Sequence, residues 1–202
     1  ILGWVLLIEG VAMQLPMIIG LVLGESEFKY FIFIGLGLIL LGTLLVIKKP
    51  KNPTMYIRDG FASTALSWIV LSLAGALPFF VSKTIPSYID AFFETVSGFT
   101  TTGATILTEI ESLPRCMLFW RSFTHFIGGM GVLVFIMAVM PMSGNHSMHI
   151  MRAEVPGPIV GKLVPRARDT AKILYLMYAA LTVLETIFLM AGGMTFYDAI
   201  LH

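Results

Sequence analysis

The residues from Gly98 to Thr105 read Gly-Phe-Thr-Thr-Thr-Gly-Ala-Thr. Extended backbone of this composition can turn successive carbonyl oxygens toward an axis, where they replace the hydration shell of a cation. Gly103 permits backbone angles that a Cβ atom disfavours. The threonine hydroxyls add neutral ligands and no charge that would trap the ion. This run therefore favours cation binding by uncharged oxygens, although a Thr/Gly-rich external turn has the same composition.

The other reactive side chains do not form a catalytic or metal-binding set. Ser97 and His125 have no supporting acid in the segment that follows His125, so a hydrolase triad is not indicated. His146 and His149 lack a third ligand nearby, and Cys116 is the single cysteine. No glycine-rich run ends in the Lys-Ser/Thr pair of a phosphate-binding loop. We expect no enzyme activity and no cofactor bound by this chain.

A short apolar helix is expected directly before the Gly/Thr run. Ser87, followed three residues later by Asp90, matches a helix-capping pattern. The apolar residues up to Ser97 give about three turns, which is too few to cross a bilayer. The carboxyl end of this helix, near Ser97 and Gly98, carries a partial negative charge that favours a cation. The chain is expected to leave helical geometry at Gly98, at membrane depth, which is tolerated only where protein buries the backbone or a watery path runs beside it.

The composition that surrounds this segment is that of a membrane protein. Of 202 residues, 57% are apolar and 12% are charged, whereas soluble domains have about 25% charged residues. The formal charge of +1 gives no basic excess for binding nucleic acid. A crossing of the bilayer takes roughly 20 apolar residues. The segments that we predict to cross it are 1–23, 30–47, 61–81, 116–140 and 171–191.

The charged loops predict the orientation in the membrane, because lysine and arginine gather in cytoplasmic loops. One basic group follows the second segment and another follows the fourth, and together they contain Lys48, Lys49, Lys51, Arg58, Arg152, Lys162, Arg166 and Arg168. We therefore expect a cytoplasmic amino terminus, with Glu25 and Glu109 outside. Residues 82–115 then begin and end on the outer face, so that they form a re-entrant loop.

An internal repeat is visible in two short stretches. Tyr88-Ile89-Asp90-Ala91-Phe92-Phe93 is echoed by Phe196-Tyr197-Asp198-Ala199-Ile200-Leu201, with the aspartates 108 positions apart. Each stretch follows an apolar segment that ends in small residues. We expect parallel repeats, each made of a spanning helix, a half-helix, a filter and a second spanning helix. One such unit cannot enclose an ion, so we expect the chain to be a piece of a longer protein.

The sequence around the half-helix resembles a known family. Residues 91–105, Ala-Phe-Phe-Glu-Thr-Val-Ser-Gly-Phe-Thr-Thr-Thr-Gly-Ala-Thr, and residues 121–131, Arg-Ser-Phe-Thr-His-Phe-Ile-Gly-Gly-Met-Gly, closely resemble the first pore loop and following helix of bacterial TrkH-type potassium uptake proteins, in the superfamily with KtrB and HKT transporters. The resemblance implies an all-α membrane protein with re-entrant pore helices and extended filter loops, in M1-P-M2 repeats related to potassium channels.

The resemblance also assigns roles to segments. Residues 1–47 would be two additional amino-terminal helices, 48–60 a cytoplasmic linker, 61–141 the first repeat, 142–168 a cytoplasmic loop and 169–202 the start of the second repeat. It implies potassium uptake across the bacterial inner membrane by a homodimer, with a cytoplasmic RCK-type partner (TrkA-like) that carries the nucleotide. A secondary cation symporter with a broken-helix substrate site remains the alternative, and the sequence leaves channel and coupled symport open.

The same resemblance gives the expected filter. The carbonyl rows would come from Thr101, Thr102, Gly103 and Ala104, with Thr105 at the outer lip, and glycine at position 103 favours potassium. Ser97 and Gly98 would support the filter from the end of the half-helix. Glu94 and Arg121 are expected at similar depths from the helical rise of about 1.5 Å per residue, and we predict that they pair behind the filter.

Three further features have structural interpretations. The glycines of Gly128-Gly129-Met130-Gly131 favour close packing over a hinge. Glu9 and Glu185 lie within predicted spans, where a carboxylate suggests function by default. Because neither lies in a filter, we expect hydrogen bonds between helices for both.

Overall fold

The computed structural model describes residues 1–47, 57–129, 131 and 167–202, and the regular elements in these ranges are all helices. The chain divides into two compact units. The first comprises Ile1–Thr54 with Ala65–Gly129, and the second comprises Met55–Thr64 with Met130–His202. The predicted filter and its supports all belong to the first unit.

The first unit begins with a helical hairpin, α1 (Leu2–Ala12), α2 (Gln14–Leu23) and α3 (Phe28–Ile47). A single residue, Met13, separates α1 from α2, because Pro16 has no N–H to donate to the carbonyl of Ala12. Glycines let α1 and α3 approach closely. A Cβ atom on Gly10 would lie 2.6 Å from the carbonyl oxygen of Gly35, and one on Gly42 would lie 2.7 Å from that of Gly3.

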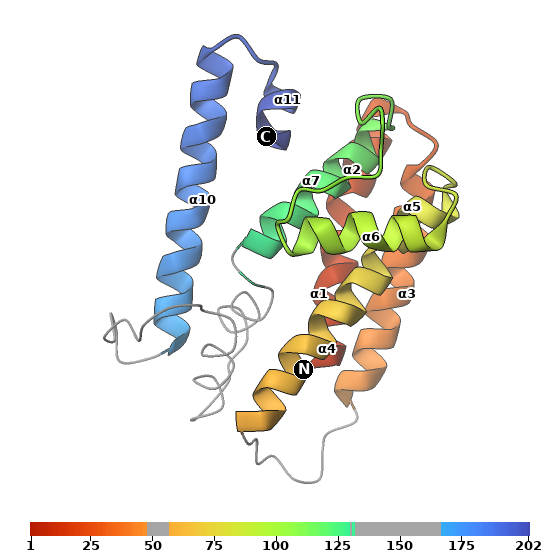
Figure 1. Cartoon of the computed structure of the whole chain (residues 1–202), viewed down its shortest axis with the longest axis vertical. Helices are drawn as coiled ribbons and strands as arrows, with labels where there is room; N and C mark the ends of the chain where they lie inside the picture. The colour runs from red at the N-terminus through yellow and green to blue at the C-terminus, as the bar shows by residue number, and fades with distance from the viewer. Residues whose placement is uncertain (48–56, 130, 132–166) are drawn as a thin grey trace. The chain divides into compact units, whose positions relative to one another are not determined.

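The predicted pore repeat follows as α4 (Ile57–Gly75), α5 (Leu77–Val81), α6 (Tyr88–Phe99) and α7 (Arg115–Gly129). The helix formed by α4 and α5 is broken at Ala76, two residues before Pro78. In Figure 1 the short α6 runs across the direction of α1 and α3, and the loop that follows it returns alongside it before rising to α7. This is the expected succession of a short helix and an extended loop, and its re-entry into the membrane stays a prediction.

The second unit contains α10 (Ala167–Ala191) and α11 (Phe196–Leu201). Helix α11 begins with the same kind of cap as α6. The Ser87 hydroxyl accepts a hydrogen bond from the Asp90 N–H, and the Thr195 hydroxyl accepts one from the Asp198 N–H. The two stretches that match in sequence thus begin helices in the same way.

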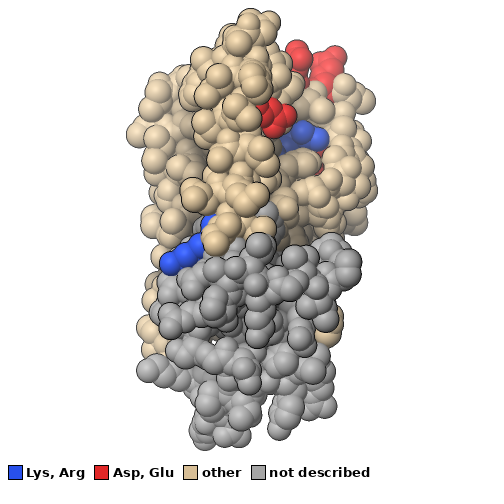
Figure 2. Space-filling model, turned by 90° about the vertical axis from the view of Figure 1, so that its left-hand side faces the viewer, with Lys and Arg blue, Asp and Glu red and all other residues tan. Residues whose placement is uncertain are grey.

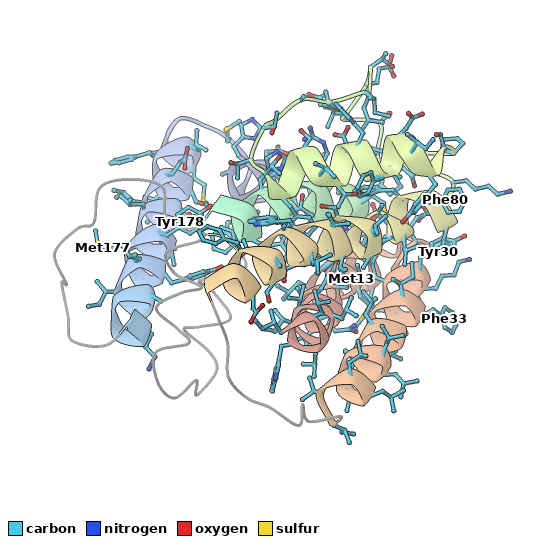
Figure 3. The ribbon with its side chains drawn as sticks, turned by 60° about the horizontal axis from the view of Figure 1, so that its bottom comes forward. Met13, Tyr30, Phe33, Phe80, Met177 and Tyr178 are labelled. Carbon is cyan, nitrogen blue, oxygen red and sulfur yellow. The ribbon has the colours of Figure 1, made fainter. Side chains whose placement is uncertain are left out.

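Four helices of the described chain have the length and apolar composition to cross a membrane, namely Leu2–Leu23, Phe28–Ile47, Asp59–Val81 and Ala171–Ala191. Many of their large apolar side chains are exposed, and Phe33 and Met177 point away from their helices (Figure 3) at 74% and 57% exposure. Charged side chains are sparse on the described part of the face in Figure 2. A lipid environment accounts for this apolar surface.

Two helices begin within segments that were expected to be loops. Helix α4 begins at Ile57, inside the expected linker 48–60, and α10 begins at Ala167, inside the expected loop 142–168. Helix α7 ends at Gly129, and Gly131 has a φ of +73°, which is not helical. The rest of the predicted span 116–140 lies outside the described residues, as do Lys48, Lys49, Lys51, His146, His149 and the basic loop 143–166.

Candidate ion-binding site

The predicted pore helix, α6, begins where the sequence predicts. The Ser87 side chain caps it, with a distance of 3.4 Å from its Oγ to the Asp90 nitrogen. The helix was expected to end at Ser97, but it continues through Gly98 to Phe99. Close packing against α7 overrides the low helix propensity of glycine here, because a Cβ atom on Gly98 would collide with the Thr124 hydroxyl.

The end of α6 and the predicted filter are joined by backbone hydrogen bonds. The N–H groups of Thr101 and Thr102 donate to the carbonyls of Gly98 and Ser97, both at 2.9 Å. Thr101 has a φ of +55° and Gly103 a φ of +76°. A β-branched residue is rarely found at positive φ. The hydrogen bonds from the filter to α6 hold Thr101 in this conformation.

The two positive φ values affect where the carbonyl groups point. In a regular strand, neighbouring residues face opposite sides. Left-handed residues on both sides of Thr102 interrupt this alternation, so that neighbouring carbonyls can face the same side. Residues 100–106 are all exposed within the described chain. This segment therefore has the uncharged oxygens and the open face that cation coordination needs.

Ser97 fixes the far end of the predicted filter. Its hydroxyl donates to the carbonyl oxygen of Ala104 at 2.6 Å, while its own carbonyl accepts from Thr102. One residue of the pore helix thus holds both ends of the segment 102–104. One lone pair of the Ala104 carbonyl is engaged in this bond, which distinguishes that carbonyl from those of Thr101, Thr102 and Gly103 among the expected ligands.

Glu94 is the second anchor, and its predicted pairing with Arg121 is confirmed. The Arg121 Nε lies 2.6 Å from Glu94 Oε1, and the exposures of the two side chains are 14% and 1%. The Thr105 hydroxyl donates to the same carboxylate at 2.9 Å and 3.0 Å, and the Ile106 N–H donates to it at 3.2 Å. A buried carboxylate with this many donors is fully compensated. Its function as a brace of the filter stays a prediction.

The glycines of α7 also hold the site. A Cβ atom on Gly128 would collide with the backbone of Phe99, the last residue of α6. At this position the packing interpretation is confirmed. Gly128 therefore packs α7 against the backbone of α6, and Gly98 packs α6 against the Thr124 side chain of α7, next to the predicted filter.

Sequence reasoning missed two other supports. The indole Nε1 of Trp120 donates to the carbonyl of Gly75 at 3.0 Å, and Trp120 is fully buried. The Glu25 carboxylate accepts from the N–H groups of Arg115 and Cys116 at 2.7 Å and 2.9 Å, which caps α7. These contacts join residues 45 and about 90 positions apart, and a single sequence has no local pattern that reveals them.

The hydrogen bonds expected for the remaining carboxylates of the predicted spans are not observed as bonds accepted by Glu9. Glu9 is 1% exposed, and neither of its carboxyl oxygens accepts a hydrogen bond in the described chain. Glu185 is exposed on α10. Among the described residues, no group of three or more His, Cys, Asp or Glu could hold a metal ion.

A family model described as "TrkH: Cation transport protein" matches residues 27–199. The chain belongs to this TrkH family. It is 39% identical to the Trk system potassium uptake protein TrkH of Halomonas elongata, over all of this chain and 42% of the relative. It is 36% identical to the Trk system potassium uptake protein TrkG of Escherichia coli, over 99% of this chain and 42% of that one.

A solved structure agrees with the family. The crystal structure of the potassium transporter TrkH from Vibrio parahaemolyticus matches 99% of this chain and 40% of that chain, with a TM-score of 0.79 and 33% identity. The present chain thus spans about two fifths of the length of its relatives. The resemblance found in the sequence is confirmed at the level of family and fold, and this TrkH-family chain is a multi-pass helical membrane protein.

Proposed function

We propose that this chain contributes one wall of a potassium uptake pore, in which the backbone from Thr101 to Ala104 coordinates the dehydrated ion and Thr105 lies at the outer lip. The observation that carries this proposal is the segment itself: positive φ at Thr101 and Gly103, uncharged oxygens, and anchors at Ser97 and Glu94. The names of the TrkH relatives, which are potassium uptake proteins, support the choice of ion.

The charge distribution supports a conducting role over a tight binding role. Glu94 is the carboxylate bound to the filter, and Arg121 and two donors from the segment already compensate it. An ion in the filter therefore meets neutral ligands, which permits release as well as entry. The symporter alternative would place its substrate site at a broken helix, and the names of the relatives, which are potassium uptake proteins, do not favour it.

The assembly that we propose follows the family. The complete protein works as a homodimer in the bacterial inner membrane, with its amino terminus in the cytoplasm and with an RCK-type subunit that carries the regulatory nucleotide. Potassium is the substrate, and this chain binds no cofactor. One exposed filter segment cannot surround an ion, so other segments of the complete protein must provide the remaining walls.

The test is ion flux through the purified full-length protein in liposomes. A potassium gradient alone should drive potassium uptake, and replacing potassium by sodium should abolish most of it. Liposomes with sodium on both sides and with protons clamped by an ionophore distinguish a pore from a coupled symporter. Uptake that required a sodium or proton gradient would favour the symporter, and the absence of potassium flux would contradict the proposal.

A further inference from the structure

Glu9 is a buried carboxyl group that the proposed pore does not use. It is the only ionisable side chain in residues 1–23 and lies in the second half of α1. Its exposure is 1%, and neither carboxyl oxygen accepts a hydrogen bond in the described chain. Glu94, which is equally buried, has an arginine and two further donors. The two carboxyl groups therefore lie in opposite chemical environments.

The position of Glu9 is directly behind the pore helix. A Cβ atom built on Gly75 would lie 3.1 Å from Glu9 Oε1, 2.8 Å from the Thr95 methyl group and 2.9 Å from the Phe99 ring. Helix α4 ends at Gly75, and Thr95 and Phe99 belong to α6. Glu9 thus connects the amino-terminal hairpin to the point where the broken helix α4–α5 meets the pore helix.

No cation compensates Glu9 in the described chain. The stretch 65–81 has no ionisable residue, and α3 has only Lys29 and Tyr30 at its start. The titratable residues of α6 and α7 are Tyr88, Asp90, Glu94, Arg115, Cys116, Arg121 and His125. None of these groups lies within hydrogen-bond or salt-bridge distance of the Glu9 carboxyl group. An ionised carboxylate in such surroundings is strongly disfavoured, and a buried carboxyl group takes up a proton instead.

The break at Ala76 offers a hydrogen-bond acceptor for the neutral acid. The N–H of Ala76 still donates to Ser72 and its carbonyl accepts from Phe80, but Pro78 has no N–H for the carbonyl of Ala74. The neighbouring carbonyls are satisfied from outside the helix, since the Tyr88 hydroxyl donates to Leu73 at 2.9 Å and Trp120 donates to Gly75 at 3.0 Å. A neutral Glu9 has one O–H donor, which a carbonyl freed at this break can accept.

We propose that Glu9 is a proton-binding site: it stays protonated in the folded protein, and its O–H donates a hydrogen bond to a carbonyl freed at the α4–α5 break, foremost that of Ala74. It acts as a positioning residue for α6, because Thr95 and Phe99 pack on the same spot. This second part rests on the proposed function, since it concerns the pore helix below the filter. The protonation itself does not depend on which ion the protein carries.

Infrared difference spectroscopy of the full-length protein in liposomes tests the protonation. Glu9→Gln should remove a band in the region of protonated carboxylic acids, and this band should persist across the neutral pH range. Glu94→Gln is the matched control, because it should remove a band in the region of ionised carboxylates. Loss of an ionised-carboxylate band on Glu9→Gln would overturn the proposal.

Potassium uptake by the same variants tests the positioning role. Glutamine is neutral, similar in shape and able to donate, so Glu9→Gln should keep uptake and potassium preference within about twofold of wild type. Glu9→Leu, which cannot donate, should reduce both. A folded Glu9→Gln protein with a more than tenfold loss of uptake would show that a negative charge is needed and would overturn the proposal.

A third variant, Glu9→Asp, tests the proposal if Glu9→Gln fails to fold. Glu9→Asp retains the acid, so it should shift the carboxylic-acid band, and a shift confined to ionised carboxylate bands would overturn the proposal.

The protonation of Glu9 and the proposed potassium pore can fail separately. Absence of potassium flux in wild type would contradict the proposed function and leave the infrared result intact.

Discussion

Gly103 has a φ of +76° and, within the described chain, no atom within 4 Å of the place where a Cβ atom would be. A substitution there therefore meets a conformational penalty rather than a collision, and the penalty is about 1–2 kcal/mol for a residue with a side chain. Thr101 already occupies this region at +55°, and its N–H is held by the carbonyl of Gly98. In the described chain Lys83 and Thr101 are the residues other than glycine with positive φ, and Thr101 lies in the segment that we propose to coordinate the ion.

We predict that Gly103→Ser lowers the preference for potassium over sodium by up to about tenfold, which corresponds to about 1.4 kcal/mol. The serine favours other backbone angles and so turns carbonyl groups of the filter away from the ion. Flux in liposomes over a range of sodium concentrations measures this change, with expression and melting temperature as controls for folding. Unchanged preference in Gly103→Ser would remove Gly103 from the filter.

The ion pair of Glu94 and Arg121 gives a second prediction at this scale. Glu94→Gln leaves Arg121 without its counter-charge, and removing one partner of a buried pair costs about 3 kcal/mol. Arg121→Gln should cost a similar amount. The double variant should cost less than the sum of the two by about 1 kcal/mol or more, because no unpaired charge remains. Thermal unfolding of all three proteins in detergent measures this coupling, and additive effects would mean that the pair does not stabilise the fold.

Among the elements, α6 and α7 depend on two glycines that collide with different kinds of neighbour. A Cβ atom on Gly98 would meet the Thr124 side chain, whereas one on Gly128 would meet the backbone of Phe99. A substitution can shorten a colliding side chain, but it cannot remove colliding backbone atoms. We predict that Gly98→Ala destabilises the protein by about 1–3 kcal/mol and that adding Thr124→Ala recovers part of the loss.

The matched variants make this prediction specific. Gly128→Ala should destabilise at least as much and should not be rescued by Thr124→Ala. Gly37→Ala on α3, where no atom lies within 4 Å of a new Cβ, should be neutral or slightly stabilising, because alanine favours helix. Melting temperatures in one detergent provide the comparison. Equal rescue of Gly98→Ala and Gly128→Ala by Thr124→Ala would contradict the packing described here.

How far the sequence predicts these elements depends on the range of the interactions. The start of α6 was predictable, because Ser87 and Asp90 are three residues apart and the cap is local. The pairing of Glu94 with Arg121 was predictable from helical rise and a shared depth. The extension of α6 to Phe99 was not, because it depends on Thr124 of another helix. The contacts of Glu25 with α7 and of Trp120 with Gly75 also depend on tertiary packing.

At the scale of the whole molecule, the repeat is supported by chemistry as well as by sequence. The caps Ser87 with Asp90 and Thr195 with Asp198 start α6 and α11 in the same way. Two spanning helices and a re-entrant loop return the chain to the face where it began, so both repeats are expected to have the same orientation. That expectation makes the sidedness of the loops testable at two well-separated positions.

We predict that the loop containing Glu109 faces the outside and that the basic linker around Lys51 faces the cytoplasm. The reason is that lysine and arginine are retained on the cytoplasmic side of short loops, while Glu109 is exposed in the loop that joins the filter to α7. The protein for this test is the full-length chain with Cys116→Ser, which removes the one cysteine of the present sequence. Single cysteines are then placed at positions 51 and 109.

A membrane-impermeant thiol reagent added to intact cells should label position 109 and leave position 51 unlabelled. Inverted membrane vesicles should give the opposite result. Residues 88–99 are too short to span the bilayer. Labelling of position 109 from the outside therefore also requires the chain to return, after α6, to the face of the membrane from which it entered. Labelling of position 109 only in inverted vesicles would place the filter loop in the cytoplasm, and both the orientation and the re-entrant pore helix would then be wrong.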